Sequence, residues 1–246
     1  GGYLAVGLFA VFLFPRWYPS NKARLGAYAM GALFAAALIL TYSRSAWLAF
    51  ALSFAITGWM LFTHHRVEMR KAVPLGLIVL VTLFFTVTLF SNPIFTRFDS
   101  TARLEAQSIE ERLDGMGEWK EVVADSVLEG VGVGNYVVAL ESAEPGREAY
   151  TYQPVHNVYL LIFSEIGILG TFFILLWAAS IDRYNYAQIP RVPAVGALAM
   201  GNAVLIIGFF DHYIWSLWPG LALLAFVMAM TLRLSEPGVE DGNKNR

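Results

Sequence analysis

Residues 23–62 read ARLGAYAMGALFAAALILTYSRSAWLAFALSFAITGWMLF, and this stretch decides the fold. It contains two long apolar runs, Ala23–Tyr42 and Ser45–Phe62, with Arg44 in the short gap between them. A helix needs about 20 mainly apolar residues to cross the hydrocarbon core of a bilayer. The stretch therefore predicts two successive membrane-spanning helices.

The rest of the chain contains further apolar runs of similar length. They predict four more spans, at Ala72–Ser91, Asn157–Ser180, Val192–Phe210 and Ile214–Leu232. Gly1–Phe14 is equally apolar but shorter, and it has neither the basic start nor the small-residue cleavage site of a signal peptide. We interpret it as the end of a truncated span, so that the sequence is the C-terminal part of a longer membrane protein.

The predicted fold class is an all-α, polytopic transmembrane bundle with about six full spans, a truncated first span and a partly helical extracytoplasmic loop. Four regions follow from this interpretation. They are transmembrane helices in 1–91, the loop in 92–156, transmembrane helices in 157–232 and a polar cytoplasmic tail in 233–246.

The composition excludes several classes of function. Apolar residues make up 57% of the 246 residues and charged residues only 15%, which is far below the quarter or so of soluble domains. The net charge of −2 and the lack of a basic tract exclude nucleic acid as a partner. The absence of cysteine excludes disulfides, zinc–thiolate sites, iron–sulfur clusters and a thiol nucleophile.

The distribution of basic residues predicts the orientation. Connections alternate between the two sides of the membrane, and most of the 17 basic residues fall on the side that holds the segment around His64 and His65. The two short turns on the other side, around Arg44 and around Asp211 and His212, contain a single arginine. The positive-inside rule therefore predicts that the 92–156 loop faces outward. His64 and His65 would then anchor the cytoplasmic face at lipid headgroups.

The outward loop has about 65 residues, and a connection of this length in a compact bundle is usually functional. Residues 101–129 have the pattern of one or two amphipathic helices, which Gly115 and Gly117 would separate. The predicted apolar stripe consists of Leu104, Ile109, Leu113, Met116, Trp119, Val122 and Val123. Glu110, Glu111 and Asp114 have the composition of a divalent ion site, but an exposed helix face explains them more simply.

Four motifs occur in a characteristic order. They are TYSRSAWLA at 41–49, Arg112 followed by Trp119, GVGVGNY at 130–136, and HNVYL at 156–160 with SEIG at 164–167. In order and spacing the sequence resembles the O-antigen ligase and polymerase family over about Ala23 to Ser180. Members of that family are longer at the N-terminus, in agreement with a truncated first span.

This resemblance implies a membrane glycosyltransferase of the bacterial inner membrane. The donor would be a glycan linked to a polyprenyl diphosphate, and the acceptor would be a hydroxyl of the lipid A core or of another glycan. Membrane lipids are the other expected partners. No metal or cofactor is expected, because arginines would neutralise the diphosphate. Ligase and polymerase are not distinguished by these motifs.

Two arginines are candidates for phosphate binding, since the planar guanidinium grips phosphate oxygens with two bonds. Arg44 lies at the outward face, where either anion binding or simple anchoring at the interface explains it. Arg112 on its own would be an exposed arginine paired with Glu111 or Glu118. The resemblance implies donor contact for Arg44 and a catalytic role for Arg112.

His156 is the candidate base. It follows Pro154 and opens a membrane helix, where the positive helix end disfavours an imidazolium and attracts anions. A lone histidine at a membrane boundary is more often structural, but the resemblance implies that this one is catalytic. Asn157 would orient its ring or cap the helix, and it is a candidate for substrate binding.

Gly132, Gly134 and Tyr136 are further candidates for substrate binding. The glycine turn lacks the features of a P-loop and of a dinucleotide fingerprint. Its amides could line a phosphate or a sugar, but close packing explains the glycines equally well.

Two other polar groups have open roles. Glu165 lies roughly 13 Å along a straight helix from His156, so the two cannot touch. A buried acceptor or a partner for an arginine is the expected role of Glu165. Asp211 and His212 would contact Arg44 or His156, or would simply form a hydrated loop end.

Two rival functions fit the same sequence. A transporter of a small anion such as bicarbonate would need charged or broken helices at mid-membrane, which the spans barely offer. A non-catalytic component of an envelope assembly would tolerate the loss of every candidate residue.

Overall fold

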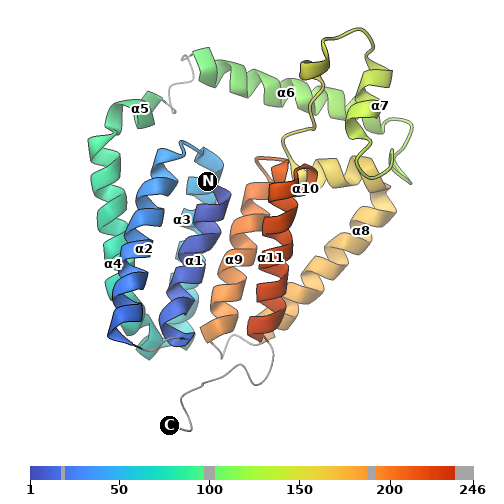
Figure 1. Cartoon of the computed structure of the whole chain (residues 1–246). Helices are drawn as coiled ribbons and strands as arrows, with labels where there is room; N and C mark the ends of the chain where they lie inside the picture. The colour runs from blue at the N-terminus through green and yellow to red at the C-terminus, as the bar shows by residue number, and fades with distance from the viewer. Residues whose placement is uncertain (18–19, 97–102, 188–191, 236–246) are drawn as a thin grey trace. The chain divides into compact units, whose positions relative to one another are not determined.

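The computed structural model describes residues 1–17, 20–96, 103–187 and 192–235, and every regular element within these ranges is helical (Figure 1). The helices are α1 (Gly2–Trp17), α2 (Asn21–Leu40), α3 (Arg44–His64), α4 (Arg66–Leu89), α5 (Ser91–Thr96), α6 (Arg103–Val123), α7 (Tyr136–Ala143), the 3-10 turn η1 (Ala149–Thr151), α8 (Val158–Ala187), α9 (Val192–Gly208), α10 (Tyr213–Ser216) and α11 (Trp218–Ser235). This confirms the all-α fold class.

Among the described residues, four helices are long and apolar enough to cross a membrane. They comprise Asn21–Leu40, Arg44–His64, Met69–Leu89 and Val158–Ile181. They correspond to four of the six predicted spans. The segments Gly2–Leu13, Val192–Gly208 and Trp218–Leu234 are apolar helices of lesser length. The protein is thus a multi-pass helical membrane protein.

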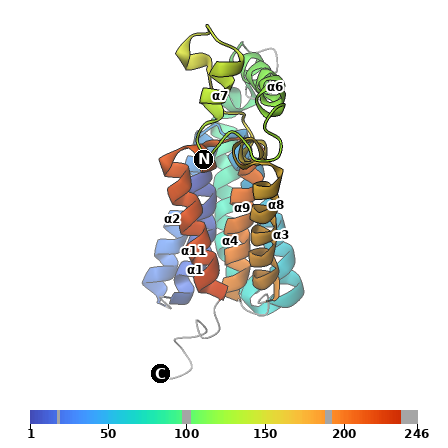
Figure 2. The ribbon, with the colours of Figure 1, turned by 90° about the vertical axis from the view of Figure 1, so that its right-hand side faces the viewer.

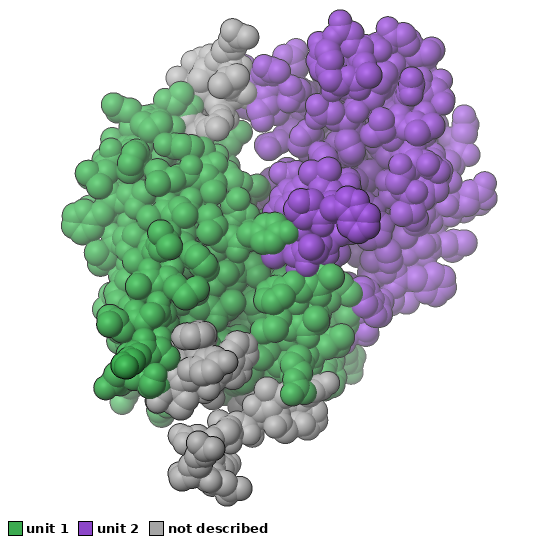
Figure 3. All heavy atoms as spheres, in the orientation of Figure 1, with its two compact units in different colours: residues 1–97, 181–207, 225–246 green, residues 98–180, 208–224 purple. Residues whose placement is uncertain are grey.

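The chain divides into two compact units (Figure 3). Unit 1 consists of residues 1–97, 181–207 and 225–246, and unit 2 consists of residues 98–180 and 208–224. The predicted regions divide the chain at other points. The polar tail lies largely outside the described residues, which end at 235.

In unit 1, helices α1 to α4 run side by side (Figures 1 and 2). Small residues allow this close packing. A Cβ atom on Gly7 would lie 2.9 Å from the Phe34 ring, and one on Gly31 would lie 2.7 Å from Leu75 Cδ1. Close approach at small residues is a usual means of helix association in membranes, where the hydrophobic effect does not drive it.

The turn between α2 and α3 places Arg44. Tyr42 adopts a left-handed conformation with φ 52°, which reverses the chain within three residues. Ser43 then caps α3 by accepting a hydrogen bond from the Ala46 amide at 3.4 Å. Trp47 Nε1 stabilises the turn by donating a hydrogen bond to the Leu38 carbonyl at 2.9 Å. Arg44 is therefore the first residue of α3.

Unit 2 has its own hydrophobic core. Val122 of α6, Tyr136 and Leu140 of α7, and Leu161 of α8 are all buried there together with Tyr152 and Val155 from the connecting segment. Trp119 joins the core from α6 and donates its Nε1 hydrogen to the Leu160 carbonyl at 3.0 Å. This core fixes the described part of the 92–156 loop to the first turns of α8.

Two details of the loop differ from the prediction. Helix α6 runs without a break through Gly115 and Gly117. In addition, only part of the predicted apolar stripe of α6 packs against the protein, because Leu113 and Met116 are 64% and 50% exposed. Gly115 is buried instead, since a Cβ atom there would stand 4.0 Å from Val155 Cα.

The last predicted span begins four residues late. Residues 213–216 form the separate short helix α10, and Leu217 is extended. Helix α11 then starts at Trp218, with Pro219 at its next position, where a missing amide hydrogen costs nothing.

Candidate functional site

Helix α8 is broken inside the span that it forms. Gly167 has φ 66° and ψ −176°, which interrupts the hydrogen bonds of the helix. In hydrocarbon the freed backbone groups need other partners. The glycine turn supplies them, because the amides of Val131 and Gly132 donate to the carbonyls of Ser164 and Glu165 at 2.8 and 2.9 Å. In return the Ile168 amide donates to the Val127 carbonyl at 2.9 Å.

The glycines of the turn are required for this docking. Gly130 and Gly132 have φ values of +74° and +95°, and Gly134 has φ +77°. A Cβ atom on Gly130 would lie 2.5 Å from the Glu165 carbonyl and the Gly167 amide. The Gly132 amide is therefore used within the fold, while Gly134 is exposed and has open space beside it.

Asn157 caps α8. Its Oδ1 accepts the amides of Tyr159 and Leu160 at 2.9 and 3.0 Å, and its Nδ2 donates to the Phe209 carbonyl at 3.2 Å. This is one of the two roles that the sequence left open for Asn157. His156 precedes this cap, partly buried, at the positive end of the helix.

His156 contacts a second histidine. The rings of His156 and His212 lie 5.2 Å apart between centroids, edge to face at 80°. His212 Nδ1 lies 2.6 Å from Ser216 Oγ, and the His212 amide donates to Asp211 Oδ1 at 2.8 Å. Burial lowers the pKa of His212; the Asp211 carboxylate opposes this shift and His156 reinforces it. Burial therefore favours the neutral form of His212.

Glu165 is a buried hydrogen-bond acceptor, which is one of the two roles that the sequence predicted. Its side chain is 4% exposed, and Oε2 accepts the Nε1 hydrogen of Trp215 at 2.7 Å. This bond joins α8, two residues before its break at Gly167, to the loop that carries His212. The loop and the broken helix thus form one assembly.

Arg112 lies on the packed face of α6, one turn before Gly115 and two turns before Trp119. Its Nε is buried and has no hydrogen-bond partner among the described residues. The two carboxylates proposed for it are engaged elsewhere. Glu111 accepts from Gln107 at 2.8 Å, and Glu118 binds Arg147. The predicted pairing of Arg112 with Glu111 or Glu118 is therefore wrong.

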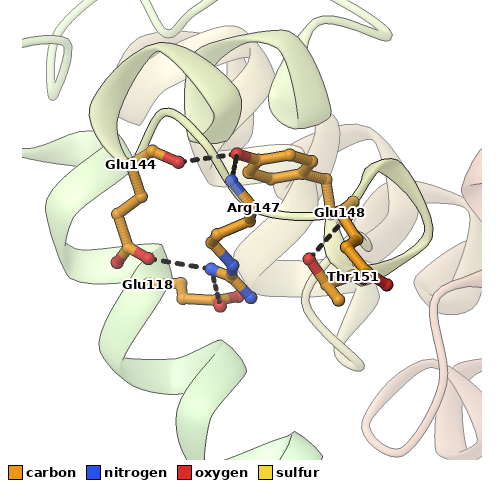
Figure 4. A network of polar contacts seen from close by, with 6 residues as sticks. Glu118, Glu144, Arg147, Glu148 and Thr151 are labelled. Atoms are coloured by element: carbon orange, nitrogen blue, oxygen red, sulfur yellow. Dashed lines mark hydrogen bonds and ion pairs between the residues drawn. The ribbon is translucent and has the colours of Figure 1, made fainter.

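Arg147 organises the outer part of the loop (Figure 4). Its Nη1 donates to Glu118 Oε1 at 2.5 Å and to Glu144 Oε2 at 2.8 Å, and its amide donates to the Tyr152 hydroxyl at 2.9 Å. The hydrogen bond to Glu118 is the largest cause that raises the pKa of Arg147. Through these contacts Arg147 joins α6, α7 and the segment before α8.

Tyr136 belongs to the core of unit 2. It is 1% exposed, and its hydroxyl is buried without a hydrogen-bond partner among the described residues. Burial, together with the charge of Glu118, raises the pKa of Tyr136. Its ring therefore supports the loop from within.

Arg44 is in unit 1, at the start of α3, and is partly buried. The remaining candidate residues His156, Arg112, Asn157, Gly132, Gly134 and Tyr136 are all in unit 2. Within the described residues no three His, Asp or Glu side chains gather as metal ligands would.

His212 is the residue whose place the sequence did not fix. The sequence left two roles open for His212, namely contact with Arg44 or His156 and a place in a hydrated loop end. The contact with His156 joins residues that are far apart in the chain, so periodicity could not reveal it.

The described residues thus belong to a helical membrane protein with one broken span. A glycine turn docks on the break, and two histidines lie beside the start of the broken helix. A family model described as O-antigen ligase matches residues 29–175, more than half of the chain. The chain belongs to the O-antigen ligase family and thus to the membrane glycosyltransferases of polysaccharide assembly. No curated protein and no solved structure matches it.

Proposed function

We propose that this chain transfers a glycan from a polyprenyl diphosphate to an acceptor hydroxyl at the outer face of the bacterial inner membrane. Lipid A core or a growing glycan would supply the hydroxyl. The observation that supports this proposal is the position of His156, at the start of α8 and on the same unit as an arginine with a buried, unpartnered Nε.

In the proposed reaction the acceptor oxygen bonds to the anomeric carbon, and the diphosphate leaves with the electron pair of the broken carbon–oxygen bond. His156 takes the hydroxyl proton, a contribution of about 10² to 10⁴ in rate. Arg112 and Arg44 neutralise the diphosphate, and charge stabilisation of this kind is usually the largest single term. Asn157 and the Gly132–Tyr136 segment shape the substrate site from the capped helix end and the turn.

Transfer by the full-length protein in proteoliposomes tests this proposal. We expect His156→Ala and Arg112→Ala to lower kcat by about 10²-fold or more, and Arg44→Ala to raise KM for the donor. His64→Gln and Arg70→Ala are matched controls, since both residues are exposed and lie on the other predicted face. Wild-type turnover in the His156 and Arg112 variants would contradict the proposal.

The acceptor distinguishes ligase from polymerase. Supplying lipid A core as the only acceptor gives product with a ligase, whereas lipid-linked glycan alone gives longer chains with a polymerase. Transport of a small anion in the absence of any acceptor, with no glycan transfer, would contradict both assignments.

A further inference from the structure

The ring of His212 is fixed in place from two directions. On one side its edge-to-face contact with His156 has the geometry that aromatic pairs prefer. On the other side Ser216 Oγ lies 2.6 Å from Nδ1. Asp211 Oδ1 accepts the amides of His212 and Tyr213, at 2.8 and 3.4 Å, and so fixes the backbone of the loop.

Ser216 Oγ contacts both the ring and the backbone of His212. It lies 2.6 Å from Nδ1 and 3.1 Å from the His212 carbonyl. A serine hydroxyl carries one proton, so it donates to one of these two groups at a time. In either case Nδ1 of His212 is held in a hydrogen bond.

Two titratable groups act on His212. The Asp211 carboxylate favours its imidazolium, whereas His156 disfavours it, and burial disfavours it most. Since the pKa of His212 is lowered, its neutral imidazole is favoured over the imidazolium. This lessens the like charge that a proton taken up by His156 would meet.

We propose that His212 is a positioning residue for His156: it holds the ring of the base in one orientation and leaves His156 as the member of the pair that takes the acceptor proton. This proposal rests on the proposed function. It extends that function by assigning the 209–217 loop a role in the transfer step.

Kinetics of the full-length protein test the role. Because a small misplacement of a reacting group costs up to about 10²-fold in rate, we expect His212→Ala to lower kcat at least ~10-fold without changing KM for the acceptor. His212→Phe keeps an aromatic ring beside His156, and we expect it to stay within about threefold of wild type at neutral pH. Trp218→Phe is the control, since Trp218 directly follows this loop, at the start of α11, and is 85% exposed.

The pH profile separates positioning from simple packing. His212→Phe removes the imidazole whose protonation would place a charge beside the base. We therefore expect the acid limb of log kcat/KM to be less steep in His212→Phe than in wild type. Ser216→Ala, which frees the ring of His212, should lower kcat in the same direction as His212→Ala but less.

Two outcomes would overturn the proposal. If His212→Ala and His212→Phe both match Trp218→Phe in kcat and slope, His212 does not position the base. If His212→Phe is as inactive as His212→Ala while still folded, a nitrogen of His212 is needed in the proton transfer itself, and the role is chemical.

A titration of the ring signals tests the pair without any turnover. The chain contains four histidines, so ¹⁵N-labelled protein can be assigned with single His→Gln variants. We expect the titration midpoint of His212 to rise in His156→Phe, because His156 is one cause of the low pKa of His212. An unchanged midpoint would overturn the pairing, whereas a rise combined with failed glycan transfer would contradict only the proposed function.

Discussion

Gly130 and Gly134 have nearly the same left-handed backbone but different surroundings. A Cβ atom on Gly130 would overlap the Glu165 carbonyl at 2.5 Å, whereas Gly134 has nothing within 4 Å. Alanine costs about 1–2 kcal/mol at either position for its backbone conformation. At Gly130 the overlap adds roughly 1–3 kcal/mol.

We therefore expect Gly130→Ala to lower the thermal midpoint in detergent by several degrees more than Gly134→Ala. Since the two share the conformational cost, the difference isolates the docking of the glycine turn on α8. Equal midpoints for the two variants would contradict that docking.

The bond between Trp215 and Glu165 gives a second prediction at the residue scale. Trp215→Phe keeps the ring but leaves the buried carboxylate of Glu165 without its donor. An unsatisfied buried polar group costs about 1–3 kcal/mol, which we expect to appear as a lower unfolding midpoint. Trp218→Phe, at an 85% exposed position, should leave the midpoint in place. Similar unfolding midpoints in both variants would contradict the structural role of Glu165 as an acceptor.

At the scale of elements, Arg147 joins α6 and α7. Both ion pairs are partly buried, with side-chain exposures of 32% for Arg147 and 14% for Glu118. Such pairs contribute roughly 0.5–1 kcal/mol. We expect Arg147→Ala to speed hydrogen exchange in α7 by about two- to fivefold.

The effect of Arg147→Ala should shrink at high salt, because ions screen the partly exposed charges. Lys120→Ala removes an exposed charge from α6 and serves as the control. Unchanged exchange in α7 at low salt would mean that the hydrophobic core of unit 2 alone holds the two helices together.

The sequence predicted the elements that depend on composition alone. Four of the long apolar runs correspond to α2, α3, α4 and α8, because a helix needs a long apolar run to cross a membrane. The start of α11 was missed because the apolar run does not stop at residues 213–216. Whether a short helix ends there depends on Pro219, whose effect is local.

The site was less predictable for a different reason. Its decisive contacts join distant segments, such as Arg147 with Glu118 and the glycine turn with Ser164 and Glu165. The Arg147 contact removed Glu118 as a partner of Arg112. Motif order predicted His156 and Arg112 as candidates. Contact of His212 with His156 was one of two alternatives left open by the sequence, and only the packing decides between them.

At the scale of the whole molecule, the orientation in the membrane remains a prediction. Arg66 lies between the membrane-length segments Arg44–His64 and Met69–Leu89, and Arg70 and Lys71 lie in the first turn of the second segment. The positive-inside rule assigns such a cluster to the cytoplasm. The 92–156 loop is then outside, where lipid-linked glycans would be presented. The proposed function requires this orientation.

The absence of cysteine makes the orientation directly measurable, since an introduced cysteine is the only thiol within these 246 residues. Tyr150 in the loop and Val67 near the basic cluster are 74% and 67% exposed. We expect a membrane-impermeant maleimide to label Tyr150→Cys in intact spheroplasts and Val67→Cys only after lysis. Equal labelling of both variants after lysis shows that each thiol is accessible. The reverse pattern would place His156 and Arg112 on the cytoplasmic side and contradict transfer at the outer face.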